Sequence, residues 1–303
     1  MSDERSQTPQ SNDIWSEWVL ERRFGGNRHV MKAAMDEYFY PVREKVLDSA
    51  KLGDHQLLLD VGCGDGLIAF RALEKSATST VIFSDVSQTL LIHTRSVAQK
   101  LTVADRCQFL AASAERLPIH SSSIDVVTAC CVLIHVAAKQ SAFNEFFRVL
   151  KPGGRMSVFE PINRLSLSEP EHLFAGFDVT PIVSIAAKVK TIYLRNQPPT
   201  DPMLNFDERD LFDFAENAGF DALQLEFQIK LERPKVSDWE TLVQRRPNPR
   251  APSLEEAMEQ VLTSEERELF VRHLRPLVES KQGRKKSGVA YLSAIKYEIA
   301  VGE

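Results

Sequence analysis

The sequence has no long apolar run, no excess of basic residues and few cysteines, and each of these absences excludes a class of protein. No uninterrupted apolar stretch approaches the ~20 residues that cross a bilayer, and residues 1–12 are polar, without the apolar core of a signal peptide. The net charge of −5 argues against a general nucleic-acid binder, which normally presents a basic face. We therefore expect a cytoplasmic protein with neither membrane nor nucleic acid as a partner.

The cysteines show no Cys-x-x-Cys spacing; they are Cys63, Cys107, Cys130 and Cys131. We expect them to be reduced and to pack as small hydrophobic residues, with no metal site. The chain is 43% hydrophobic and 26% charged, which is typical of a globular protein with one large core, or one core with a cap. Residues 1–12 are rich in Ser, Gln, Asp and Asn and are expected to form a disordered tail.

The most informative stretch is an apolar run at residues 57–61 that leads into Gly62, Gly64 and Gly66. The run predicts a buried strand, and the glycines predict a tight turn whose backbone approaches a bound nucleotide. Apolar residues at helical spacing over residues 67–73 predict a helix whose first N–H groups face an anion. The further glycine of the dinucleotide-binding fingerprint is missing, so this turn alone does not identify the ligand.

A second strand is predicted at residues 80–83, followed by Asp85 about twenty residues beyond the turn, where an acid can hold ribose hydroxyls. This order of strand, Gly-x-Gly-x-Gly, helix, strand and acid resembles the class I S-adenosylmethionine-dependent methyltransferases. Three further stretches extend the resemblance over roughly residues 55–163: the adenine loop at Ala112–Pro118, the fourth strand at Ile124–Ala129, and the helix-to-strand turn at Phe147–Arg155.

The resemblance and the alternation of strand and helix patterns imply an α/β fold with a doubly wound, mostly parallel, seven-stranded sheet, the Rossmann-like methyltransferase fold. A helical N-terminal lid and helical cap insertions are expected to surround it. The predicted segments are a disordered tail at 1–12, the lid at 13–52, the cofactor-binding core at 53–164, a cap insertion at 165–206, and the rest of the sheet at 207–303 with a helical insertion at 237–280.

The resemblance also implies where the cofactor S-adenosyl-L-methionine and its product S-adenosyl-L-homocysteine bind. Asp60 would order the glycine loop and approach the cofactor's amino group, unless it merely caps the turn, and Asp85 would bind the ribose. The expected cofactor-binding residues are Asp60, Gly62, Cys63, Gly64, Gly66, Asp85, Val86, Ser113, Ala114, Glu115 and Cys130. Ser113 departs from the family's pattern, which places an aspartate there, and a hydroxyl accepts the hydrogen bond from the adenine more weakly than a carboxylate does.

Two residues are candidate catalytic bases. His135 follows the fourth strand and could take a proton near neutral pH or simply pack, whereas Glu160 in the fifth strand could be a base or a structural acid bonded to backbone N–H groups. Three aromatic residues are candidates for the substrate pocket or lid. Trp15 and Trp18 lie on a short predicted helix that either covers the substrate or pins itself to the core, and Tyr38 either lines the pocket or packs inside.

We expect methyl transfer to a small organic acceptor that is a secondary metabolite or resembles a quinone or an isoprenoid. The alternative is a protein of the same fold that binds S-adenosylmethionine without methylating, as a binding module or as a cyclisation or rearrangement enzyme. Nucleic-acid methyltransferases usually carry Asn/Asp-Pro-Pro-aromatic after the fourth strand, where residues 130–133 read Cys-Cys-Val-Leu. The added acid cluster of metal-dependent enzymes and the glutamate pair of protein methyltransferases are missing from the same loop.

Two basic clusters lie in the last third of the chain: Arg245 and Arg246 with Arg250, and Lys281 with residues 284–286. Such clusters are usually solvated surface. A cluster that faced the pocket would instead favour an acidic or phosphorylated substrate, and guanidinium groups suit that role better than ammonium groups do. The N-terminal helices could also pack across a homodimer.

Overall fold

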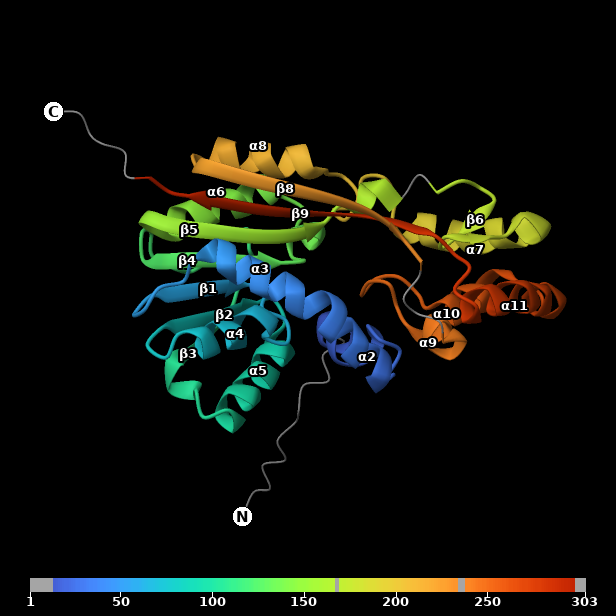
Figure 1. The fold of residues 1–303 in the computed structure, drawn as a ribbon, viewed down its shortest axis with the longest axis horizontal. Helices are drawn as coiled ribbons and strands as arrows, with labels where there is room; N and C mark the ends of the chain where they lie inside the picture. Colours follow the sequence, from blue (N-terminus) through green and yellow to red (C-terminus); the bar gives the residue numbers. More distant parts are fainter. Residues whose placement is uncertain (1–12, 167–168, 234–237, 298–303) are drawn as a thin grey trace, which may run out of the picture.

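A seven-stranded sheet runs through the computed structural model, which describes residues 13–166, 169–233 and 238–297 (Figure 1). In sheet order the strands are β3 (Cys107–Ala111), β2 (Thr80–Asp85), β1 (Leu57–Val61), β4 (Ile124–Cys130), β5 (Leu150–Pro161), β9 (Lys285–Ile295) and β8 (Asp221–Glu232). The pairs from β3 to β5 are parallel, and β9 is antiparallel to both of its neighbours. This confirms the expected mostly parallel, doubly wound sheet.

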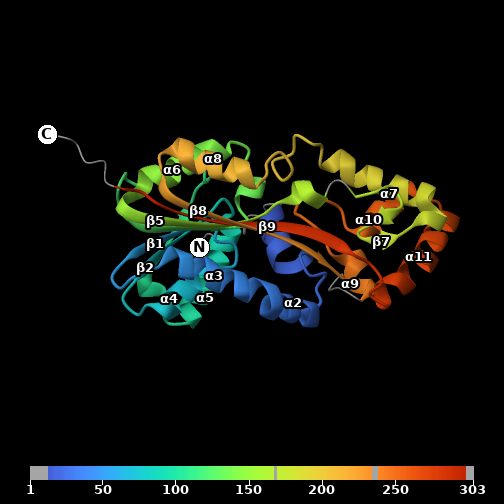
Figure 2. The same cartoon turned by 45° about the horizontal axis from the view of Figure 1, so that its top comes forward.

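Side chains of the central strands alternate between two apolar clusters. Leu58 and Val126 join one cluster, whereas their chain neighbours Leu59 and Val127 join the other. Because successive strand residues point to opposite faces, each strand is buried on both sides and reads as a continuous apolar run. The covering helices are α3 (Tyr40–Ala50), α4 (Leu67–Lys75) and α5 (Gln88–Lys100) on one face, with α6 (Lys139–Val149) and α8 (Glu208–Ala218) on the other (Figure 2).

The N-terminal helices contain two π-helical turns. They are α1 (Ile14–Glu17), a π turn at Trp18–Arg22, α2 (Arg28–Ala34) and a π turn at Met35–Phe39 that leads into α3. The sequence predicts a break at Pro41, but the helix continues from Arg28 to Ala50 through the second π turn, directly before Pro41. Proline has no N–H to donate, and the wider turn accommodates it without ending the helix.

A second group of elements lies beyond the carboxyl ends of the parallel strands (Figure 1), and we call it the distal subdomain. It consists of β6 (Leu173–Phe174), β7 (Phe177–Asp178), α7 (Val183–Asn196), α9 (Trp239–Gln244), α10 (Leu254–Val261) and α11 (Ser264–Glu279). These elements bury an apolar cluster of their own, centred on Val189, Met258 and Phe270. The apolar stripe predicted for the helix around Val189 is therefore buried inside the subdomain.

Several helices begin at the residues that the sequence predicts. Asp207 is the N-cap of α8, and both predicted capping boxes form, Ser253 with Glu256 and Thr263 with Glu266. Such caps contribute about 1 kcal/mol each. The short 3-10 helices are Ala104–Arg106, Leu133–His135, Asn163–Ser166 and Thr180–Ile182.

The last strand is longer than expected. The sequence predicts it from Val289, whereas β9 begins at Lys285, because its first residues pair with the end of β8 beyond the reach of β5. Within the described ranges, no helix is long and apolar enough to cross a membrane. The division into segments stays a prediction, and the tail at residues 1–12 lies outside the described part of the chain.

Candidate active site and cofactor-binding cavity

A cavity of about 330 Å³ lies at the carboxyl ends of β1, β2 and β4. The chain runs from β1 outward to β3 on one side and then crosses to β4 and β5 on the other. This reversal separates the loops after β1 and β4, and doubly wound sheets bind their ligands in the resulting crevice. The cavity extends from the glycine turn after β1 to aromatic side chains of the N-terminal helices.

The glycine turn forms one wall of the cavity, and its three glycines do different things. Gly62, Gly64 and Gly66 have φ angles of +62°, +55° and +87°. A Cβ at Gly62 would lie 2.5 Å from Val132, and one at Gly66 would lie 2.4 Å from the ring of Phe70. A Cβ at Gly64 would meet no atom within 4 Å, and Gly64 lines the cavity. The backbone at Gly64 is thus open to a ligand, whereas Gly66 lies off the cavity wall and shapes the start of α4.

Two buried carboxylates line the cavity beside this turn. Asp60 Oδ1 accepts a hydrogen bond from Thr128 Oγ1 at 2.9 Å, while Oδ2 is buried without a partner among the described residues. Burial raises the pKa of Asp60 to about 7. Asp85 accepts hydrogen bonds from the backbone N–H groups of Gly64 at 3.0 Å and Ser87 at 2.9 Å. The Asp60 oxygen without a partner could accept a hydrogen bond from a cationic group of a ligand. The Asp85 carboxylate still has lone pairs that could accept hydrogen bonds from ligand hydroxyl groups.

The loop after β3 closes another side of the cavity. Ser113, Ala114 and Glu115 line it together with Val86. Ser113 Oγ accepts a hydrogen bond from the Glu115 N–H at 3.2 Å, and Glu115 Oε1 accepts one from the Ala138 N–H at 2.8 Å. The serine hydroxyl keeps its own hydrogen and one further acceptor position, so it can still bind an amine.

The far end of the cavity is lined by Trp15, Trp18, Phe39, Cys130 and His135, and we call it the aromatic end. Trp15 and Trp18 meet the His135 ring edge-on, with centroids 4.8 and 6.5 Å apart. Burial lowers the pKa of His135 to about 4, and neighbouring positive charges add to this effect. Neither ring nitrogen has a hydrogen-bond partner within the described residues, so the neutral imidazole can accept a proton.

Glu160 is fully buried and lies off the cavity wall. Its Oε1 accepts hydrogen bonds from the N–H groups of Val132 and Leu133 at 2.8 Å each, and Oε2 accepts one from Ile134 at 3.1 Å. These contacts are those of the structural acid, the second of the two roles that the sequence leaves open for Glu160, because the carboxylate is occupied and lies off the cavity wall. Glu160 instead holds the loop that carries His135.

Glu160→Gln is expected to lower the free energy of unfolding by about 1–3 kcal/mol, the usual cost of a buried group left without its partner. The amide nitrogen would place a donor against one of the three loop N–H groups that the carboxylate accepts from. Urea denaturation measures the change. A variant as stable as the wild type that loses activity would restore Glu160 as a catalytic group.

Tyr38 also lies off the cavity wall and takes the second of its two predicted roles, packing inside. Its ring packs in the core against Phe39, at a centroid distance of 5.0 Å, and Phe159, at 6.3 Å. Phe39 lines the cavity in its place. Regular helical spacing could not identify Phe39, because the π turn at Met35–Phe39 shifts the angular phase of the side chains that follow.

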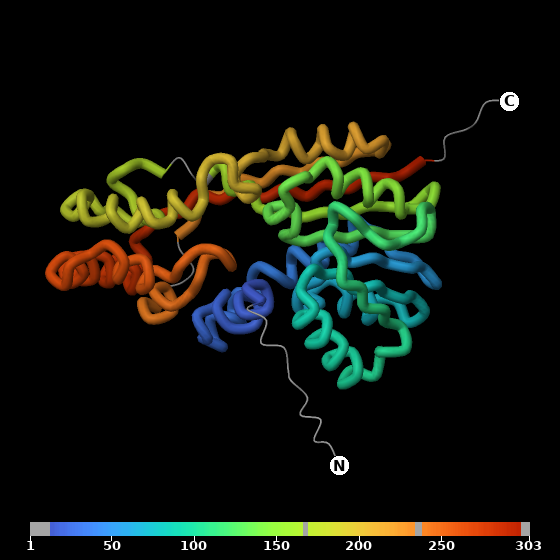
Figure 3. Tube along the Cα trace, turned by 180° about the vertical axis from the view of Figure 1, so that it is seen from behind, coloured from blue at the N-terminus to red at the C-terminus, as the bar shows by residue number. Residues whose placement is uncertain are grey.

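The N-terminal helix at residues 14–22 connects the cavity to the distal subdomain. At its start, Asp13 Oδ2 accepts a hydrogen bond from Ser87 Oγ at 2.5 Å, next to the loop after β2. Farther along, Trp18 Nε1 donates to the Arg246 carbonyl at 3.0 Å, and Arg22 pairs with Glu256 at 2.8 Å. Figure 3 shows these N-terminal helices between the sheet and the orange helices of the subdomain. The helix is therefore fixed at both ends while its tryptophans face the cavity.

Deleting residues 1–26 is expected to weaken binding of S-adenosylhomocysteine about tenfold or more, since the cavity would lose its two tryptophan walls. Calorimetric titration measures the affinity, and circular dichroism checks that the sheet is still folded. Trp18→Phe is the milder companion, because it removes the indole N–H that bonds to Arg246 but keeps an aromatic ring at this position. Unchanged affinity in the deletion would refute a covering role for this helix.

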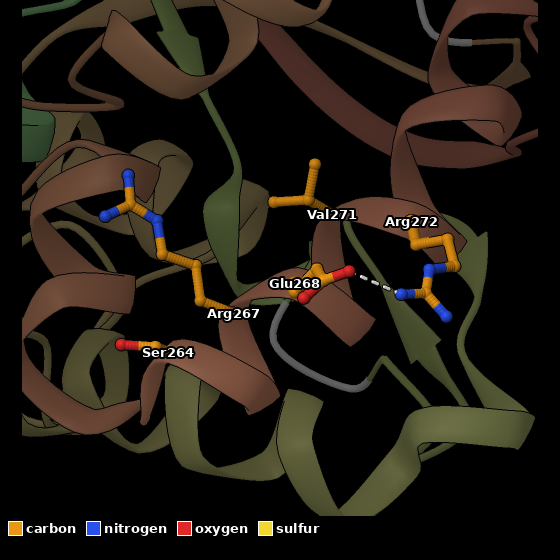
Figure 4. A pocket seen from close by; sticks show the side chains of 5 residues that line it. All are labelled: Ser264, Arg267, Glu268, Val271 and Arg272. Atoms are coloured by element: carbon orange, nitrogen blue, oxygen red, sulfur yellow. Dashed lines mark hydrogen bonds and ion pairs between the residues drawn. The ribbon is translucent and has the colours of Figure 1, made fainter.

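A second hollow lies along α11 in the distal subdomain (Figure 4). It is lined by Ser264, Arg267, Glu268, Val271 and Arg272. Arg267 pairs with Glu255 at 2.9 Å, and Arg272 pairs with Glu268. Because both arginines are paired with glutamates and all five lining residues come from one face of α11, we assign no function to this hollow. Within the described ranges, no group of three or more His, Cys, Asp or Glu side chains could hold a metal ion.

Comparisons with known proteins agree with this geometry. A family model described as a methyltransferase domain matches residues 59–158. The chain is 33% identical over 171 residues to the ubiquinone/menaquinone biosynthesis C-methyltransferase UbiE of Cereibacter sphaeroides, covering 54% of this chain and 66% of that protein, a little under two thirds of its length.

Solved structures show the same fold at low sequence identity. The cyclase SpnF aligns with a TM-score of 0.51 at 22% identity, covering 85% of this chain and 81% of its own. Phosphoethanolamine N-methyltransferase 2 of Haemonchus contortus, in complex with S-adenosylmethionine, aligns with a TM-score of 0.52 at 16% identity, covering 94% and 57%.

The sheet order and the cavity at its reversal point define a Rossmann-like nucleotide-binding fold of the methyltransferase type. The matching family model over residues 59–158 and the quinone-biosynthesis relatives make the chain similar to the class I S-adenosylmethionine-dependent methyltransferases. The unpartnered oxygen of Asp60 and the open backbone at Gly64 fit a ligand with an ammonium group and a carboxylate, as the family's cofactor has.

Proposed function

We propose that the protein transfers a methyl group from S-adenosylmethionine to a small acceptor that resembles a quinone or an isoprenoid. One observation carries the proposal: a single cavity contains both the Gly64 turn with its carboxylates Asp60 and Asp85 and the aromatic end with His135. A donor bound at the first part would therefore share an enclosed space with an apolar, planar acceptor at the second. The sequence relatives in quinone biosynthesis support an acceptor of this kind.

Bound S-adenosylmethionine supplies a methyl group that its sulfonium has already activated. Asp60 would hold the ammonium group, and Asp85 would hold the ribose hydroxyls. Trp15 and Trp18 would exclude water and align the acceptor, and such positioning can supply about 7–11 kcal/mol of the barrier. His135 would take the proton from an acceptor hydroxyl or acidic carbon, because burial keeps its imidazole neutral at pH 7.

The test is to incubate the full chain with methyl-labelled S-adenosylmethionine and a panel of hydroquinones, phenols and isoprenoid alcohols. We expect labelled product and S-adenosylhomocysteine in equal amounts with at least one acceptor. His135→Ala should reduce kcat about 100-fold or more, within the usual range for a general base. His120→Ala is the matched control, because His120 is exposed and lies off the cavity wall.

The second candidate is a protein that binds the cofactor without methylating, since the cofactor motifs report binding and not turnover. Tight binding of S-adenosylmethionine with no S-adenosylhomocysteine formed across the panel would favour it. Failure to bind either cofactor form would refute both candidates. The cytoplasmic location and the homodimer expected from the sequence stay predictions.

A further inference from the structure

Lys139 is buried, with 4% of its surface exposed, and among the described residues no other lysine or arginine is. It is the first residue of α6 and follows the loop that carries His135. Lysine is almost never buried without partners, because its ammonium group loses its hydration. Neither the cofactor-binding part of the cavity nor the methyl transfer proposed above uses this residue, so its burial calls for another role.

The ammonium group of Lys139 joins two separate segments of the chain. It donates hydrogen bonds to the Val136 carbonyl at 3.0 Å, the Pro202 carbonyl at 2.8 Å and the Asn205 Oδ1 at 3.0 Å. It also stands 4.5 Å from the ring centre of Phe206. All three of its hydrogens are therefore used, and all three acceptors are neutral. Val136 lines the cavity, whereas the other partners lie between α7 and α8, in the segment that leads from the distal subdomain back to the sheet.

The loop of residues 131–138, which we call the His135 loop, is held from three sides. Glu160 accepts three N–H groups near its start, and Glu115 accepts one at its end. Lys139 holds it from the carbonyl side, at the residue that directly follows His135. The loop contributes five residues to the cavity wall: Cys131, Val132, His135, Val136 and Ala137. Its position therefore decides where the imidazole points.

Apolar packing alone does not explain the contacts of Lys139. A methionine has a similar length and could fill the space beside Phe206 without burying a charge. The ammonium group adds fixed geometry, because each of its hydrogen bonds requires a narrow range of distances and angles. Burial lowers the pKa of Lys139 to about 8, against the opposing effect of four carboxylates on the surrounding elements: Glu160, Asp201, Asp210 and Glu115. The group therefore still carries its charge at pH 7.

We propose that Lys139 is a positioning residue: it fixes the His135 loop to the segment between α7 and α8, so that the imidazole stays directed at the aromatic end of the cavity. The inference rests on the proposed function and deepens it, because it concerns the candidate base. It also connects the distal subdomain to that base, although no described residue after Ala137 lines the cavity.

The first test measures the pKa of His135 by NMR titration of the full chain with labelled histidine, using His135→Ala to assign the signal. Burial holds the pKa of His135 low, and the nearby charge of Lys139 adds to this effect. Lys139→Met removes the charge and releases the loop, so the pKa of His135 should rise toward its ordinary value. A His135 signal that titrates as in the wild type would overturn the inference.

The second test is kinetic and uses an acceptor from the panel described above. Lys139→Met should lower kcat about tenfold or more and leave the KM for S-adenosylmethionine unchanged, because a small displacement of a catalytic group slows the chemical step. Calorimetry with S-adenosylhomocysteine checks that the cofactor site is intact. An unchanged kcat, or a loss of cofactor affinity as large as the loss of kcat, would contradict a positioning role.

Lys296→Met is the matched control. The Lys296 ammonium group donates to two backbone carbonyls, at 2.8 and 2.7 Å, and stands 4.6 Å from the ring centre of Phe147. It lies off the cavity wall, near the start of β5, so its loss should leave both the pKa of His135 and kcat unchanged. Changes as large as those in Lys139→Met would overturn the inference.

Asn205→Ala is the milder variant and decides the matter if Lys139→Met does not fold. Asn205 is exposed, and its loss removes one of the three hydrogen bonds of the ammonium group. We expect the pKa of His135 to rise and kcat to fall, each by less than in Lys139→Met, and no change in either would overturn the inference. The absence of product from every acceptor would count against the proposed function instead, and the titration of His135 would still test the role of Lys139.

Discussion

Asp60→Asn is expected to weaken S-adenosylmethionine binding about 10- to 100-fold, because a hydrogen bond to a charged group contributes about 1.5–3 kcal/mol. The wild-type carboxylate offers a buried, unpartnered oxygen to the ligand's ammonium group, whereas the asparagine would present an amide N–H₂ or a neutral oxygen. Oδ1 can still accept the hydrogen bond from Thr128, so the loop should keep its shape. Calorimetry with both cofactor forms measures the loss.

The same substitution should make the unliganded protein more stable above pH 7. Burial raises the pKa of Asp60 to about 7 from its ordinary value of 3.8, so ionising this group costs the folded state free energy. The cost is absent below pH 4, grows between pH 4 and pH 7, and is constant above pH 7. Asparagine avoids it, and we expect the variant to be more stable than the wild type at pH 8 and to have no such advantage at pH 4.

Cofactor affinity should also depend on pH through Asp60. A cationic ligand binds the ionised carboxylate, so affinity should fall up to about tenfold per pH unit below pH 7 in the wild type and stay flat in Asp60→Asn. An affinity in the wild type that is level between pH 5.5 and pH 8 would contradict the assignment of Asp60 to the ammonium group.

Gly64→Val is expected to reduce S-adenosylhomocysteine affinity about 100-fold or more, equal to about 2.7 kcal/mol. The new side chain would meet no protein atom near its Cβ, so it would extend into the cavity and occupy the space of the ligand. Its φ of +55° is also costly for a β-branched residue, by about 1–3 kcal/mol.

Gly153→Val is the matched control for this strain. Gly153 has a φ of +78° and an equally open Cβ position, but it lies at the start of β5, off the cavity wall. Both variants should lose similar stability in thermal denaturation, and only Gly64→Val should lose the ligand. A comparable loss of affinity in the two variants would mean that general destabilisation, and not occlusion of the cavity, is responsible.

Much of the fold could be predicted from the sequence because its signals are local. The run at residues 57–61 is apolar because both faces of β1 are buried. Asp85 ends β2, and parallel strands bring such end residues to one edge of the sheet. Asp207 and the two capping boxes specify helix starts through their own side chains. These features need no knowledge of distant contacts.

The parts that the sequence leaves open depend on contacts between distant segments. The sequence allows Glu160 to be a base or a structural acid, because its three partners lie in the loop after β4, which no local pattern connects to β5. Arg23 and Phe39 line the cavity only because the N-terminal helix is anchored to Arg246, more than two hundred residues later in the chain.

The position of β9 has a consequence for how the chain assembles on the ribosome. β9 follows β8 in the chain, yet it lies between β5 and β8, and within the described residues β8 pairs with β9 alone. The parallel part of the sheet, from β1 to β5, can form during translation. β8 can join the sheet only after β9 has been synthesised, because β9 is its pairing partner. The helix at residues 14–22 must wait for Arg246 and Glu256, so the cavity is expected to close only after the segment that carries these two residues has left the ribosome.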